Sequence, residues 1–182
     1  MTQVSTEAFD KLYHSPLQRA AQTAAIVWGD RAGPVSVLSG LREIDLYSFQ
    51  GLLKHEGKAR FGSAFASWQR QAAQFEIDGQ APVRWVTDNG CVFFHHTKPR
   101  RELWYRASMA WHTILDTPDD CNSLLVVAHN AVNQALIATA LGLPATYFRR
   151  LLQSNAAVSV LDLQPTLTVN PRVTVDRLNQ VR

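Results

Sequence analysis

A continuous apolar stretch over residues 123–128 constrains the possible folds more than any other part of the chain. It reads Ser-Leu-Leu-Val-Val-Ala, a pattern typical of a strand buried on both faces of a parallel sheet. A helical pattern follows over residues 132–141, and Gly142 is a suitable helix stop. We therefore expect a central strand that leads directly into a helix.

The same alternation of strand and helix extends along the chain. Further strands are predicted over residues 9–13, 35–38, 158–162 and 172–176, and further helices over residues 16–28, 58–75, 102–115 and 147–152. At the first helix, Ser15 is expected to cap the free N–H groups and Pro16 to take the first helical position. This order predicts an α/β fold of three layers, α/β/α, with a mostly parallel sheet. Ligands of such sheets bind at the carboxyl ends of the strands.

Composition limits the class of protein. The 182 residues are 46% apolar and 18% charged, which suits one domain, residues 1–182, with a packed core and excludes wholesale disorder. The sequence has no run of 18 apolar residues, and its first nine residues have no apolar or arginine-rich targeting pattern, so neither a membrane span nor a targeting segment is predicted. Two cysteines, Cys91 and Cys121, fit a reducing compartment better than a disulfide scaffold.

The formal net charge of +3 is concentrated in one segment. Residues 85–101 contain Lys98, Arg100 and Arg101 against the single acid Asp88. Nucleic-acid binding would need a basic patch or stripe on the fold. A solvated loop explains this short excess better, so we predict no nucleic-acid partner.

Candidate functional residues follow three of the predicted strands. Arg19 lies one turn inside a helix whose N-terminus faces the strand ends, where it could hold a phosphate or remain a surface arginine. Glu43 and Asp45 follow the second strand, and one of them could be a pocket acid while the other is solvated. His129 follows the strand at 123–128 and suits either catalysis and anion binding or a structural role.

Four motifs occur in a fixed order along the chain. They are Ser15-Pro-Leu-x-Arg19-Ala-x-Gln-Thr-Ala24, Leu41-x-Glu43-Ile-Asp45, Val126-Val-Ala-His129 and Asn155-Ala-Ala-Val-Ser-Val160. Together they resemble the histidine phosphatase superfamily, which has the phosphoglycerate-mutase-like fold. The longer stretches 41–53, 126–141 and 148–163 resemble a plant and algal branch that is often labelled 2-carboxy-D-arabinitol-1-phosphatase-like.

The resemblance implies a mechanism and a set of roles. A neutral histidine attacks the phosphoryl group and forms a phosphohistidine, which water then hydrolyses, and no metal or other cofactor is needed. Arg19 would clamp the phosphate, Glu43 would be the acid and base, and His129 would be the second, charge-stabilising histidine. Asn130, where the family often has glycine, and Asn155 at the pocket rim would complete the phosphate site.

The family's nucleophile is absent from the chain. It belongs to an Arg-His-Gly motif at the end of the family's first strand, and that tripeptide occurs nowhere in this sequence. His14, at the end of the strand predicted over residues 9–13, is not expected to replace it. We therefore expect an N-terminally truncated chain that lacks this strand, so that the strands at 9–13 and 123–128 expose backbone and apolar side chains.

A second departure lies at residues 85–101, which interrupt the family pattern. The segment has no helical or strand period over its length, and we expect an inserted, irregular loop, either a retained intron or a real excursion near the cleft. Cys91, His95 and His96 invite comparison with a zinc site, but no fourth ligand has a suitable spacing, so no metal is predicted.

The resemblance therefore implies a phosphatase of a small phosphorylated sugar or sugar acid, inactive as the chain stands. A binding or regulatory protein without activity and a phosphoglycerate-type mutase are the alternatives. No membrane partner is expected, and the oligomeric state is left open. The plant-type branch implies a chloroplast location, with the cytoplasm as the alternative.

Overall fold

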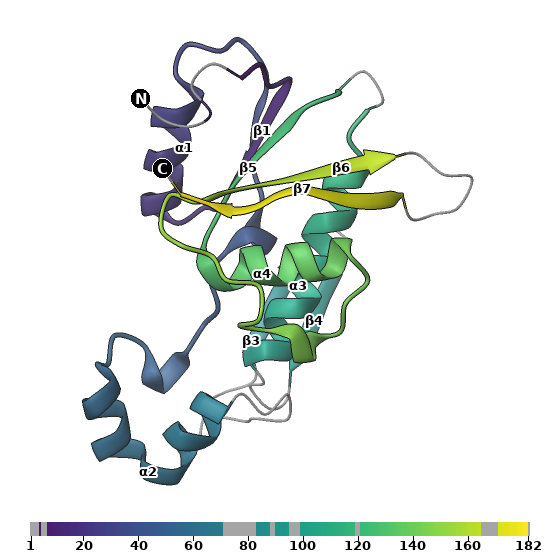
Figure 1. Cartoon of the computed structure of the whole chain (residues 1–182). Helices are drawn as coiled ribbons and strands as arrows, with labels where there is room; N and C mark the ends of the chain where they lie inside the picture. The colour runs from purple at the N-terminus through teal and green to yellow at the C-terminus, as the bar shows by residue number, and fades with distance from the viewer. Residues whose placement is uncertain are drawn as a thin grey trace.

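The computed structural model describes residues 4, 7–70, 83–87, 90–94, 99–118, 121–164 and 171–181. Figure 1 shows the arrangement of its helices, strands and 3-10 helices, the last labelled η in the text. In chain order they are β1 (Lys11–His14), α1 (Gln18–Trp28), β2 (Val35–Val37), η1 (Ser39–Leu41), η2 (Tyr47–Phe49), α2 (Lys54–Arg70), β3 (Val83–Thr87), β4 (Gly90–Phe94), α3 (Pro99–Leu115), β5 (Leu124–Val127), α4 (Asn130–Ala140), η3 (Ala145–Tyr147), β6 (Val158–Gln164) and β7 (Arg172–Gln180).

A parallel sheet in the order β2-β1-β5 forms the middle layer. Leu12 of β1 is in register with Val35 of β2 and with Leu125 of β5. Side chains alternate between the two faces of a strand, so each face can bury its own row of apolar residues. The predicted mostly parallel α/β fold is confirmed.

Helices cover both faces of this sheet (Figure 1). On one face, Leu12 packs with Ala24 and Trp28 of α1, joined by Leu125 and Val127. On the other face, Tyr13, Leu124 and Val126 pack with residues of α3 and α4. The alternation of Leu12 and Tyr13 along β1 therefore builds the three predicted layers.

The strand predicted over residues 123–128 is shorter and less buried than expected. β5 spans Leu124–Val127, and its four residues are half-buried. Within the described ranges, β5 is paired only with β1, which makes it an edge strand of the sheet. The expected exposure is therefore found at β5, whereas Leu12 and Tyr13 of β1 are buried because α1 and the helices α3 and α4 cover them.

One helix ends as the sequence predicts, and another begins later than predicted. α4 ends at Ala140, and Gly142 closes its last turn as predicted. Gly142 has a left-handed φ of 65°, its N–H donates to Thr139 O, and the Leu143 N–H donates to Ala138 O, which together close the last turn. α1 begins at Gln18 rather than at Pro16, because Leu17 is still extended.

Three other elements differ from their predicted form. α2 begins at Lys54, and Gly62 interrupts it with a φ of 48° and a ψ of −116°. The helix predicted over 147–152 is absent; η3 ends at Tyr147, and the left-handed φ of Arg149 is incompatible with a right-handed helix. β6 and β7 are longer than predicted and form an antiparallel pair of their own.

The prediction of an irregular loop over residues 85–101 is partly wrong. β3 and β4 pair antiparallel, from Val83 with Phe94 to Thr87 with Gly90, and α3 begins at Pro99. The sequence Asn89-Gly90 between β-branched and aromatic residues is a hairpin signal. His95 and His96 lie outside the described residues, and the single domain with an insertion remains a prediction.

Candidate active site

The candidate site lies where β1 and β5 end. These strands are parallel and adjacent, so the residues that follow them meet at one edge of the sheet. The Ser15 N–H donates to Val127 O across 3.0 Å, which holds the two strand ends together. Ser15 and His129, which are separated by more than a hundred residues in the sequence, thereby become neighbours.

His129 is buried between Ser15 and Arg19. Its Nε2 lies 2.8 Å from Ser15 Oγ, and the Arg19 Nε–H donates to its Nδ1 across 3.2 Å. Arginine can only donate, so Nδ1 is unprotonated and the proton is on Nε2, from which it is donated to Ser15 Oγ. The predicted pair of Arg19 and His129 therefore comes together.

The imidazole of His129 favours its neutral form. Burial lowers the pKa of His129 below its ordinary value of 6.5, and the positive charge of Arg19 lowers it further, whereas Glu43 acts in the opposite direction. In this state His129 can stabilise negative charge by hydrogen-bond donation rather than by a positive charge of its own. A bound anion would raise its pKa.

The Glu43 carboxylate lies on the N-terminus of α4, directly after His129. Its Oε1 accepts from the N–H groups of Ala131 and Val132, at 3.1 and 3.2 Å, and its Oε2 accepts from Ala131 at 3.1 Å. The Ile44 N–H also donates to Oε1 across 2.8 Å. A carboxylate here satisfies N–H groups that have no partner within the helix and is stabilised by the helix dipole.

Buried side chains of α3 hold the loop that carries Glu43. The guanidinium of Arg106 donates to Arg42 O at 2.9 Å, to Gly40 O at 3.4 Å and to Glu43 O at 3.2 Å. Further along the loop, the Tyr47 hydroxyl donates to the carboxylate of Glu102. Both α3 residues are buried, so the position of Glu43 is set by the helix beneath it.

A pocket of about 410 Å³ opens beside Glu43. It is lined by residues of the loop after β2, of α2, of the start of α4 and of the loop between η3 and β6: Glu43, Ile44, Leu46, Trp68, Asn130, Ala131, Gln134, Phe148, Arg149, Leu152, Gln153 and Ser154. Of the two acids after β2, Glu43 lines the pocket and Asp45 instead accepts from the Tyr47 N–H. Asp45 is half-buried rather than solvated, and the roles of both acids remain predictions.

The two asparagines of the predicted phosphate site differ in their surroundings. Asn130 lines the pocket, but its amide donates to Gln153 O and accepts from Gln134 Nε2. Asn155 is exposed and follows Ser154, the last lining residue. Their binding roles remain predictions.

The remaining histidine near the strand ends, His14, is half-buried, and its Nδ1 lies 2.8 Å from Ser15 O. Like Arg19 and His129, it is not among the residues that line the pocket. The described part of the chain has no group of three or more His, Cys, Asp or Glu side chains placed to hold a metal ion.

Almost the whole chain matches a known family model. The model for the histidine phosphatase superfamily, branch 1, matches residues 2–174. The chain belongs to this superfamily. The fold agrees with that membership, since the alpha-ribazole phosphatase from Shigella flexneri superposes with a TM-score of 0.74 at 20% identity, over 97% of this chain and 76% of that one. A mycobacterial glucosyl-3-phosphoglycerate phosphatase in complex with VO3 gives a TM-score of 0.70 at 22% identity, over 94% of this chain and 77% of that one.

Two plant proteins are more similar in sequence to this superfamily member. It is 51% identical over 175 residues to a protein of Arabidopsis thaliana named "Probable 2-carboxy-D-arabinitol-1-phosphatase" and 48% identical to the 2-carboxy-D-arabinitol-1-phosphatase of Triticum aestivum. Each match covers 96% of this chain and 32% of the relative, so the chain spans about a third of the length of these relatives.

Four residues at or below the site were not singled out as such from the sequence. Ser15 was expected only to cap a helix; its Oγ does accept from the Leu17 N–H at 3.2 Å, but it also contacts His129. Gln134 and Arg149 lie within the longer stretches 126–141 and 148–163 but were given no role, and Arg106 lies in none of the motifs. The only local signal was a polar or charged residue among apolar positions of a helix, as for Gln134 and Arg106.

We predict that the Glu43 carboxylate stabilises the fold as well as the site. Glu43→Ala should lower the free energy of unfolding in urea by about 1–2 kcal/mol, because it leaves N–H groups of α4 without their acceptor. Glu43→Gln keeps one acceptor oxygen and should cost less. The exposed Asp30 provides the control, and Asp30→Ala should change stability by no more than about 0.5 kcal/mol. Equal losses for Glu43→Ala and Asp30→Ala would contradict the capping role.

We further predict that His129 makes stability depend on pH. The folded protein holds a neutral imidazole, whereas the unfolded chain takes up a proton below about pH 6.5. The contribution of His129 is therefore complete above that pH and is lost as the pH falls towards its lowered folded pKa. Between about pH 7.5 and about pH 5.5, the free energy of unfolding should fall more steeply in the wild type than in His129→Gln. Parallel curves for the two proteins would refute this.

Proposed function

We propose that this superfamily member binds and, with its nucleophile present, hydrolyses a small phosphorylated sugar or sugar acid. The observation that carries the proposal is the contact of Arg19, on the first turn of α1, with His129, directly after β5, and the Glu43 carboxylate on the N-terminus of α4. Cationic and hydrogen-bonding groups beside a carboxylate are what metal-free phosphoryl transfer requires. The similarity to the two plant phosphatases supports the substrate class.

Arg19 and His129 would hold the phosphate. Arg19 is exposed on the first turn of α1, so its guanidinium is accessible to an anion, and a helix N-terminus adds favourable backbone dipoles. The proton on His129 Nε2, which contacts Ser15 Oγ at 2.8 Å, could turn to a phosphate oxygen. These donors would stabilise the charge that grows on the phosphoryl oxygens in the transition state.

Glu43 would move the protons. In the first step a histidine nitrogen bonds to phosphorus while the bond from phosphorus to the ester oxygen breaks, and the leaving alkoxide takes a proton from the Glu43 carboxyl. In the second step the Glu43 carboxylate takes a proton from water, and the resulting hydroxide displaces the histidine from phosphorus. The position of Glu43 on the lining of the pocket suits both proton transfers.

The nucleophilic histidine is the part that this chain does not contain. Arg-His-Gly is absent from the 182 residues, and we propose that the motif belongs to a strand encoded outside them. The edge of β5, which has no partner strand within the described residues, supports this proposal. An upstream, in-frame strand with Arg-His-Gly in the full transcript would agree with the proposal, and an in-frame stop codon directly before Met1 would contradict it.

Two other functions use the same site. A regulatory protein would keep the anion site and bind phosphate without hydrolysis. A mutase would pass the phosphoryl group from the phosphohistidine to a second hydroxyl instead of to water.

The chloroplast is the proposed location, on the basis of similarity to plant proteins, and a fluorescent fusion of the full-length gene product would test it. No helix within the described ranges has the length and hydropathy to cross a bilayer.

We predict that the chain binds inorganic phosphate through Arg19. Calorimetry should show binding by the wild type, and Arg19→Ala should weaken it by about tenfold or more, because a charge-assisted hydrogen bond is lost. Arg172, an exposed arginine at the start of β7, provides the control, and Arg172→Ala should bind like the wild type. Equal affinities of the wild type and Arg19→Ala would remove the phosphate site from this position.

We predict that the isolated chain does not turn over a generic phosphate ester such as 4-nitrophenyl phosphate. Release of 4-nitrophenolate should remain at the background rate, because no Arg-His-Gly histidine is present to form the phosphohistidine. Turnover that is abolished by His129→Ala, and by no other histidine substitution, would show that the chain supplies its own nucleophile.

A further inference from the structure

Arg149 occupies an unusual position at the rim of the pocket. It follows η3 in the loop towards β6, lines the pocket and is exposed. Its backbone φ of 64° lies in the left-handed region, which is costly for a residue with a side chain and is common at ligand sites. Its guanidinium carbon lies 5.5 Å from the ring centroid of Trp68 and 5.7 Å from that of Phe148.

A chain of amide contacts keeps the Arg149 backbone in this conformation. The Arg149 N–H donates to Oε1 of Gln134, a buried residue of α4. Gln134 Nε2 donates to Asn130 Oδ1 at 2.6 Å, and Asn130 donates to Gln153 O. The network joins the first turns of α4, which lie beside His129 and Glu43, to Arg149 and Gln153, the two ends of the loop segment 149–153.

Among the residues that the structure describes, no carboxylate forms an ion pair with Arg149. Arg100 lies over the same Phe148 ring, with its guanidinium carbon 5.0 Å from the centroid, and adds a second positive charge. Partial burial lowers the pKa of Arg149, and burial together with the charge of Arg149 lowers that of Arg100.

We propose that Arg149 binds a carboxylate of the phosphorylated substrate, at a subsite distinct from that of the phosphate. The guanidinium presents a planar fork of N–H donors that matches a carboxylate. Trp68 and Phe148 hold the guanidinium by cation–π contacts, so little conformational freedom is lost on binding. Gln134 is the positioning residue for this subsite. The proposal rests on the proposed function and narrows its substrate class to sugar acids.

Two ligands that differ only at the relevant group test the proposal. Calorimetry on the full chain compares 3-phosphoglycerate with glycerol 3-phosphate, in which CH₂OH replaces the carboxylate. The wild type should bind 3-phosphoglycerate about tenfold more tightly, since one charge-assisted interaction is added. In Arg149→Gln the two affinities should become equal, while the affinity for glycerol 3-phosphate stays unchanged. Arg149→Lys, which keeps the charge but not the fork, should retain part of the difference.

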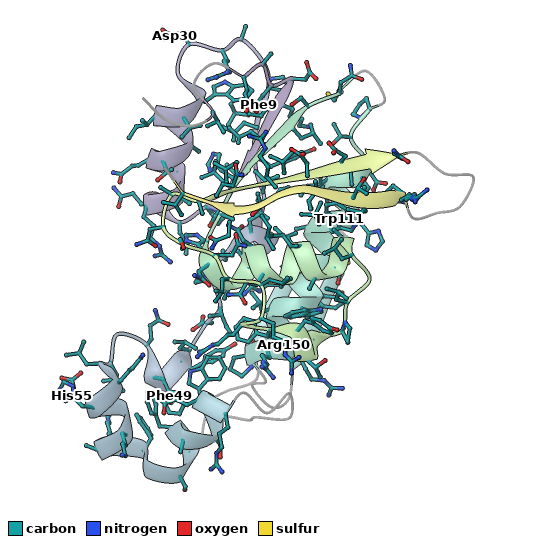
Figure 2. The ribbon with its side chains drawn as sticks, in the orientation of Figure 1. Phe9, Asp30, Phe49, His55, Trp111 and Arg150 are labelled. Atoms are coloured by element: carbon teal, nitrogen blue, oxygen red, sulfur yellow. The ribbon has the colours of Figure 1, made fainter. Side chains whose placement is uncertain are left out.

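The next residue in the chain provides a matched control. Arg150, which is labelled in Figure 2, is also exposed and is not among the pocket-lining residues. Its guanidinium carbon lies 5.7 Å from the ring centroid of Tyr147. Arg150→Gln should therefore keep the wild-type preference. Equal affinities of the wild type for the two ligands, a preference that survives in Arg149→Gln, or an equal loss of preference in Arg149→Gln and Arg150→Gln would each overturn the proposal.

Inorganic phosphate separates this proposal from the one on which it rests. If phosphate alone does not bind, or binds equally well to Arg19→Ala, the phosphate site is wrong. The comparison of the two ligands would still test the role of Arg149, because the two ligands differ only at the carboxylate. If phosphate binds through Arg19 and the wild type does not distinguish the two ligands, only the Arg149 subsite is wrong.

Discussion

The Glu43 carboxylate on the N-terminus of α4 is the interaction on which the site depends. It accepts from Ala131 and Val132 and thus joins the loop after β2 to the helix after β5. The first N–H groups of a helix have no partner inside it and attract negative charge. One carboxylate therefore satisfies the helix, places an acid beside His129 and opposes the effects that lower the pKa of His129.

The residues that hold the Glu43 loop are buried, whereas Arg149 at the rim of the pocket is exposed. Arg106 carries a buried guanidinium that donates to three carbonyl groups of the loop before and at Glu43. Removal of such a donor would leave buried carbonyl groups unsatisfied. Arg149, by contrast, is exposed on a backbone with a left-handed φ, held by the side-chain amide of Gln134 and packed against the rings of Trp68 and Phe148.

Local patterns predicted the elements that are long or strongly apolar. The stretch before His129, the stop at Gly142 and the helix that carries Arg19 were found because period and capping chemistry are local. The segment 147–152 was predicted as a helix, but the side chain of Gln134, on the preceding helix α4, holds Arg149 in a left-handed conformation. The hairpin of β3 and β4 was missed because the segment has no single period over its length, whereas it contains two short strands.

By itself, the sequence determined the superfamily and the α/β class and pointed to Arg19, Glu43 and His129 as candidate site residues, because motif order and residue chemistry are properties of the chain. Only the tertiary structure decided what these side chains do to one another. The parallel pairing of β1 with β5 brings Ser15 and Arg19 to His129 and sets its tautomer. Packing of α3 against the loop directs Glu43 to α4. Such contacts join residues that are far apart in the chain, and no local period records them.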